Sequence, residues 1–173
     1  MNNDNQFSNR GYDIGRNVFD TTLIENLKTG IAQLLLAEIN NSNQLLGKEV
    51  FDSDKNIDDL ANILAKRDRK LLGLVYDRIR LLPSFYRLLA DDGMLIKAKE
   101  ILETNLLYIP FDKAQIRLDR HNENHGLSWH QDYQYNMMSN PTITFWIPLT
   151  TTTPKMGTLK IIPNSHKGAR PTA

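Results

Sequence analysis

The 173-residue sequence predicts an α+β protein in which helices come first and a β-sandwich or barrel follows. Apolar residues recur at helical spacing up to about residue 105, and short alternating or β-branched segments replace them from about residue 106. The content of 40% hydrophobic and 24% charged residues is ordinary for a chain that folds around a core. We therefore expect a polar lead-in over residues 1–20, a helical segment over 21–105 and a β-region over 106–173.

The lead-in is rich in Asn, Asp and Gly, and it lacks the apolar stretch of a signal peptide. The longest apolar run, "IAQLLLAEI", is too short to cross a bilayer. A net charge of +1 gives no electrostatic argument for nucleic acid. The absence of cysteine excludes disulfides, thiolate catalysis and cysteine zinc sites. We expect a cytoplasmic protein with no membrane or nucleic-acid partner.

The helical segment is predicted to begin at Thr22, where Thr22-x-x-Glu25 has the spacing of a capping box. An apolar stripe follows until the turn-like cluster Asn40–Asn43. A second stripe starts near Asn56 and must break at Pro83, which has no amide hydrogen and clashes with the preceding turn. A short helix is expected after Pro83, and one or two further turns over residues 94–102.

The β-region is predicted from three segments. "AQIRLDR" (114–120) alternates, with Ala114, Ile116 and Leu118 on one face. "TITFWIPL" (142–149) is rich in β-branched and aromatic residues, and "GTLKIIP" (157–163) is a third short strand. Together with the stretch 127–136 described below, only about four or five strands are predicted. So few strands would leave an open sheet edge, so we expect self-association or a longer parent protein.

The stretch "LSWHQDYQYN" (127–136) contains a candidate metal pair. In a strand, residues i and i+2 point to the same face, so His130 and Asp132 would project together and Gln131 would point away. One further histidine would complete the 2-His-1-carboxylate triad of non-haem Fe(II) oxygenases. The spacing alone is also typical of chance pairs on a surface.

The order of motifs is more informative than the spacing. Trp129-His130-x-Asp132 is followed by the apolar strand 142–149 and then by "GTLKIIPNSHKG". In this order, over about residues 112–168, the chain resembles the phytanoyl-CoA dioxygenase-like family of Fe(II)/2-oxoglutarate oxygenases. The resemblance implies a double-stranded β-helix (a jelly-roll, cupin-like core), possibly incomplete here. It also implies that His130 and Asp132 bind Fe(II), with 2-oxoglutarate as cosubstrate and dioxygen and a small organic molecule as substrates.

The resemblance further implies a second histidine ligand and a 2-oxoglutarate-binding arginine beyond the Pro-x-Ser-His element. The sequence contains neither, so we expect an N-terminal fragment of such an oxygenase or a chain without the third ligand. His166 belongs to a turn in the family and is not a ligand there. Asn164 replaces the family's usual glycine and tolerates the same left-handed conformation.

Other residues are weaker candidates. Arg117 has a guanidinium suited to an anionic cosubstrate, and a surface role is equally compatible with its pattern. Thr144 is a candidate contact for 2-oxoglutarate, whereas Trp146 is expected in the core. The remaining candidates are loop histidines or residues near the mouth of the pocket: His121, His125, Trp129, Tyr133 and Tyr135.

Two other functions are compatible with these residues. A non-catalytic cupin-like binding module, or an inactive remnant, would account for a missing third ligand. A zinc hydrolase would use His130, Asp132 and His166, because zinc accepts nitrogen and oxygen ligands and activates water.

Overall fold

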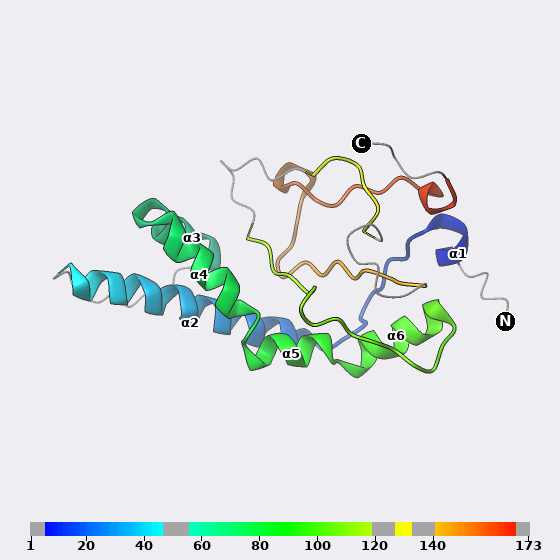
Figure 1. Cartoon of the computed structure of the whole chain (residues 1–173), viewed down its shortest axis with the longest axis horizontal. Helices are drawn as coiled ribbons and strands as arrows, with labels where there is room; N and C mark the ends of the chain where they lie inside the picture. Colours follow the sequence, from blue (N-terminus) through cyan, green and yellow to red (C-terminus); the bar gives the residue numbers. More distant parts are fainter. Residues whose placement is uncertain (1–5, 47–55, 119–126, 133–140, 169–173) are drawn as a thin grey trace. The chain divides into compact units, whose positions relative to one another are not determined.

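The computed structural model describes residues 6–46, 56–118, 127–132 and 141–168. The chain divides into two compact units. One comprises residues 20–91 and 109–123, and the other comprises residues 1–19, 92–108 and 124–173. We refer to them as the helical unit and the loop unit. Figure 1 shows the elements of each.

The helical unit is organised by one long helix, α2 (Thr21–Leu45). It contacts α3 (Ile57–Arg67), α4 (Arg69–Ile79) and α5 (Pro83–Leu89), which follow it in the chain (Figure 1). Leu27, Ile31, Leu35 and Ile39 of α2 are fully buried at a spacing of four residues. This spacing places them in one stripe, so the burial of their side chains drives the packing of the other helices against α2.

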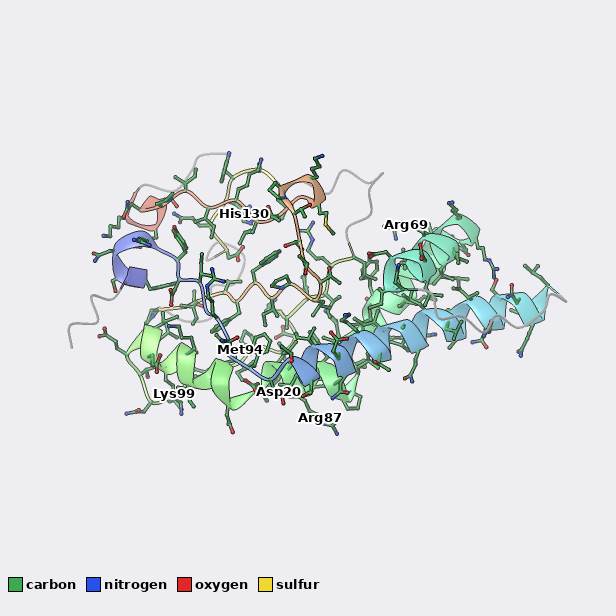
Figure 2. The ribbon with its side chains drawn as sticks, turned by 180° about the vertical axis from the view of Figure 1, so that it is seen from behind. Asp20, Arg69, Arg87, Met94, Lys99 and His130 are labelled. Carbon is green, nitrogen blue, oxygen red and sulfur yellow. The ribbon has the colours of Figure 1, made fainter. Side chains whose placement is uncertain are left out.

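The start of α2 differs from the predicted capping box. Asp20, labelled in Figure 2, is the N-cap, and its side chain accepts a hydrogen bond of 2.9 Å from the amide of Thr22. This bond lowers the pKa of the Asp20 carboxyl below its usual value. Glu25 instead pairs with Lys28 at 3.0 Å, one turn along the helix. Aspartate is a strong N-cap residue, and the N-cap lies at Asp20, two residues before the predicted Thr22.

The end of α2 was also predicted wrongly. The helix continues through the cluster Asn40–Asn43 to Leu45. Asn43 is 3% exposed, and its side-chain oxygen accepts a bond of 2.6 Å from Arg67, which also donates to the carbonyl of Ile39 at 3.2 Å. Arg67 comes from α3, so a contact distant in sequence satisfies the buried amide and overrides a local turn signal.

The second predicted stripe forms two helices instead of one. Asp68 ends α3 with its amide bonded to the carbonyl of Leu64, and its side chain accepts 2.8 Å from the amide of Lys70 at the start of α4. The predicted break at Pro83 is confirmed, because Pro83 occupies the first turn of α5. Among the described helices, none is long and apolar enough to cross a membrane.

The predicted double-stranded β-helix is not observed. In the described parts of the chain there is no β-strand, and the fold there is helical with extended and turn segments. Ala114, Ile116 and Leu118 are half-buried and alternate with exposed Gln115 and Arg117, as the pattern predicts. Alternation follows from extended backbone alone, however, whereas a strand also needs a neighbour to pair with its amides and carbonyls.

The helical unit shows what the segment 114–118 contacts in place of a neighbouring strand. The hydroxyl of Tyr76 in α4 donates to the carbonyl of Leu118 at 2.9 Å. Nearby in the sequence, the ring of Phe111 lies 5.5 Å from that of Tyr86 in α5. These two contacts join residues 111–118 to α4 and α5.

The loop unit contains the short helix α1 (Gln6–Arg10), α6 (Asp92–Leu102) and the 3-10 turns η2 (Pro154–Met156) and η3 (Ser165–Lys167). The predicted lead-in therefore includes a helix that its composition did not indicate. The lead-in is joined to α6 by an ion pair of 2.8 Å between Asp13 and Lys97. The third predicted strand has half-exposed apolar residues here: Leu159, Ile161 and Ile162.

Removing core volume from α2 is expected to destabilise the helical unit. Leu35→Ala should lower the free energy of unfolding by about 2–5 kcal/mol, because it leaves a cavity in a fully buried stripe. Urea unfolding followed by far-ultraviolet circular dichroism measures the change. Leu45→Ala is the matched control, since Leu45 is 89% exposed at the end of the same helix. Equal effects of the two changes would contradict this core.

The Asp13–Lys97 pair predicts a pH-dependent contribution to stability. The hydrogen bond from Lys97 lowers the pKa of Asp13 below 3.8, and the same bond raises the pKa of Lys97 above 10.5. A lowered carboxyl pKa contributes stability above 3.8 that is lost as the pH falls through the folded value. A raised amine pKa contributes stability below 10.5 that is lost as the pH rises through the folded value.

Lys97→Met should therefore lower the free energy of unfolding by less than about 1 kcal/mol at neutral pH, since both side chains are partly exposed. The difference from wild type, measured by urea unfolding across the pH range, should shrink as the pH falls through the lowered pKa of Asp13. A difference that persists undiminished in acid would show that Lys97 acts through packing.

Candidate metal centre

His130 and Asp132 lie in an irregular segment, 127–132, that contains no strand. The premise that a strand aligns the two side chains is therefore wrong. They meet nevertheless: Nε2 of His130 lies 3.3 Å from Oδ1 of Asp132. His130 is labelled in Figure 2.

The backbone fixes the imidazole of His130. Nδ1 lies 2.7 Å from the carbonyl oxygen of Ser128, two residues earlier. A carbonyl oxygen only accepts, so Nδ1 carries the proton and donates. In the neutral ring Nε2 then has its lone pair directed outward. Metal-binding histidines commonly have this arrangement, in which the second ring nitrogen donates to a backbone carbonyl and orients the first.

The distance between Nε2 and the carboxylate has an electrostatic consequence. Two acceptors at 3.3 Å repel each other unless a positive charge accompanies them. That charge is either a proton on Nε2 or a cation bound by both groups. The side chains are 27% and 46% exposed, so a cation from solvent can reach them. Imidazole and carboxylate are both groups that can bind a cation, and among the described residues no third His, Cys, Asp or Glu joins them.

Gln131, between the two candidate ligands, faces a different partner. Its amide Nε2 donates to the carbonyl of Ser165 at 3.1 Å. Gln131 was predicted to have a structural role, and this hydrogen bond is a contact through which it could act. It connects the His-x-Asp segment to the turn of the "PNSHKG" element, 34 residues later. The two motifs that carried the resemblance are neighbours in the loop unit.

The turn itself has the predicted conformation. Asn164 has φ 65° and ψ 0°, in the left-handed region, and its amide donates to the carbonyl of Arg10 at 2.8 Å. His166 follows in η3, and its Nε2 lies 3.0 Å from the carbonyl of Ser8 in α1. As for His130, the carbonyl accepts, so Nε2 of His166 is a donor here.

In this structure His166 therefore bonds to the backbone of α1, and it lies on a turn as the resemblance implied. Among the described residues, no three His, Cys, Asp or Glu side chains form a group that could hold a metal ion. This excludes the zinc triad of His130, Asp132 and His166 in this structure. His121, His125, Tyr133 and Tyr135 lie outside the described residues.

The two candidate 2-oxoglutarate contacts belong to different units of the chain. Arg117 is exposed and belongs to the helical unit, whereas Thr144 is exposed in the loop unit. Their roles stay predictions. Trp146 was expected in the core, but it is 49% exposed. Its alternating neighbours Ile143 and Ile147 are the more buried ones, so the apolar face of this segment is the opposite one.

Comparison with known protein families shows to which family the chain belongs. The family model for Phytanoyl-CoA dioxygenase (PhyH) matches residues 7–172. The chain belongs to this family. The resemblance noted over residues 112–168 thus extends through the helices and α1. A search of curated proteins found no significant match, and a search of solved structures also found none.

Members of the phytanoyl-CoA dioxygenase family are Fe(II)/2-oxoglutarate oxygenases. His130 and Asp132 are the residues here that fit the family's metal chemistry, since imidazole and carboxylate both suit Fe(II). Sequence reasoning missed the part played by Ser8, Gly11 and Arg10 near this site. The only local signal was the Arg10-Gly11 step, which is typical of a helix C-terminus.

The left-handed turn predicts a difference between two substitutions at Asn164. Asn164→Ala should lower the free energy of unfolding of the loop unit by roughly 1 kcal/mol, because alanine has no means to offset the left-handed backbone. Asn164→Gly should cost less, since glycine adopts this conformation freely. Thermal unfolding of both variants followed by tryptophan fluorescence tests the difference, and a more stable alanine variant would contradict it.

Proposed function

We propose that the chain acts in a non-haem Fe(II)/2-oxoglutarate-dependent dioxygenase that hydroxylates a small organic substrate. The observation that carries the proposal is the His130–Asp132 pair, with the imidazole oriented by the Ser128 carbonyl and its Nε2 beside the carboxylate. Membership of the phytanoyl-CoA dioxygenase family supports the same chemistry.

In this proposal Nε2 of His130 and Oδ1 of Asp132 are two ligands of Fe(II). When bound with 2-oxoglutarate, Fe(II) supplies the activation of dioxygen: one oxygen atom enters the substrate C–H bond, and the other enters the succinate formed with loss of CO₂. The residues of the chain hold and orient the ion. The Ser128 carbonyl accepts from Nδ1, so Nε2 is the ring nitrogen that would bind the ion.

The carboxylate of Asp132 has a second part in this proposal. It places a negative charge beside the neutral imidazole, which favours a divalent cation over a neutral ligand. We assign Arg117 and Thr144 as contacts of 2-oxoglutarate on their chemistry: a guanidinium pairs with a carboxylate through two parallel hydrogen bonds, and a hydroxyl can donate to it.

Anaerobic titration with Fe(II) and 2-oxoglutarate tests the proposal. The protein should develop a weak visible charge-transfer band and should consume 2-oxoglutarate when oxygen is admitted. His130→Ala and Asp132→Ala should abolish both signals, because each removes one ligand. Asp112→Ala is the matched control, since it removes a carboxylate that is 71% exposed in the other unit.

The alternatives give different results in the same experiment. A band without 2-oxoglutarate consumption would indicate a binding module. Zinc-dependent hydrolysis without 2-oxoglutarate would indicate a hydrolase. Either result, or a band that survives His130→Ala, would overturn the proposal.

A further inference from the structure

Three hydrogen bonds connect the N-terminus of the chain to the metal pair within the loop unit. His166 Nε2 donates to the Ser8 carbonyl at 3.0 Å, and the Asn164 amide donates to the Arg10 carbonyl at 2.8 Å. Gln131 then donates to the Ser165 carbonyl at 3.1 Å. We call the contact between α1 with Gly11 and the turn Asn164–His166 the clasp.

Gly11 makes the clasp possible. It ends α1 with φ 80°, and its amide bonds to the carbonyl of Phe7 at 2.7 Å. A Cβ at this position would lie 2.3 Å from Nδ1 and 2.8 Å from Cγ of His166. Such distances are far below van der Waals contact, so the imidazole occupies the space that any other side chain would take. The close packing of the His166 ring against the end of α1 therefore requires glycine at position 11.

The clasp determines where the Ser165 carbonyl lies. Residues 164 and 166, on either side of it, are both bonded to α1, which leaves the peptide between them little freedom. That carbonyl is the acceptor for Gln131. Gln131 is the residue between His130 and Asp132, so its backbone dihedrals set the position of one ligand relative to the other.

We propose that Gln131 is a positioning residue for metal binding and that the clasp, by fixing the Ser165 carbonyl, holds His130 and Asp132 at the separation a metal needs. This inference rests on the proposed function. It assigns the N-terminal helix a part in the metal site, although no residue of α1 is a metal ligand in the proposal.

Co(II) binding measured by tryptophan fluorescence tests the inference. Co(II) accepts the same nitrogen and oxygen ligands as Fe(II) and is stable in air. In a Trp146→Phe background Trp129 is the remaining tryptophan, directly before His130, and bound Co(II) should quench it. All variants below are made in this background.

Gln131→Met keeps the length of the side chain and removes the amide donor. We expect the Kd for Co(II) to rise about tenfold, the lower end of the effect of groups that orient a metal ligand. Gly11→Ala should raise it similarly, because the new methyl group displaces His166. Gly73→Ala is the matched control: a Cβ there meets nothing within 4 Å, and the affinity should not change.

A second measurement reports on the clasp without metal. Trypsin cleavage after Arg10 requires α1 to leave the turn, so Gly11→Ala should be cut faster than wild type and Gly73→Ala at the wild-type rate. Circular dichroism verifies that each variant is folded. If Gly11→Ala does not fold, Gln131→Met decides the inference, because it alters a side chain outside the clasp.

The outcomes separate the two proposals. If His130→Ala loses Co(II) binding while Gln131→Met, or a folded Gly11→Ala, binds like wild type, the clasp inference is overturned and the metal pair stands. If His130→Ala binds Co(II) as wild type does, the proposed function fails and the inference fails with it. Weakened binding in Gln131→Met and Gly11→Ala, with faster cleavage of Gly11→Ala, supports the inference.

Discussion

Four side chains of the described residues donate to backbone carbonyls, and these bonds join segments that form no sheet. In a sheet, the amides of a neighbouring strand would be the donors. Here His130 donates to Ser128, Gln131 to Ser165, His166 to Ser8 and Tyr76 to Leu118. Three of these bonds join segments that are far apart in the sequence, whereas the bond from His130 to Ser128 is local.

The helices could be predicted from the sequence because their information is local. The stripe of α2 and the break at Pro83 depend on residues within a few positions of each other. The end of α2 could not be predicted, since it depends on Arg67 reaching Asn43 from another helix. The β-region was predicted wrongly for a related reason: alternation indicates which side chains share a face, but pairing depends on a partner that the pattern does not name.

The proximity of His130 and Asp132 could be predicted to the same extent. His130 and Asp132 are two residues apart, so almost any turn or strand brings them near each other, and the order of later motifs indicated the family. The reason for their proximity was not predictable. It depends on the Ser128 carbonyl and on the bond from Gln131 to a turn 34 residues away. The left-handed Asn164 was foreseen because it is a property of one residue type.

Asp68 joins α3 and α4 without any intervening loop, and this has a consequence for how the protein can change. The same residue closes one helix through its amide and opens the next through its carboxylate. A residue inserted in the first turn of α4 would turn the buried side chains after it by about 100° around the helix axis. Leu72, Val75 and Ile79 would then face water together. Insertions and deletions among relatives should therefore be rarer near this corner than substitutions.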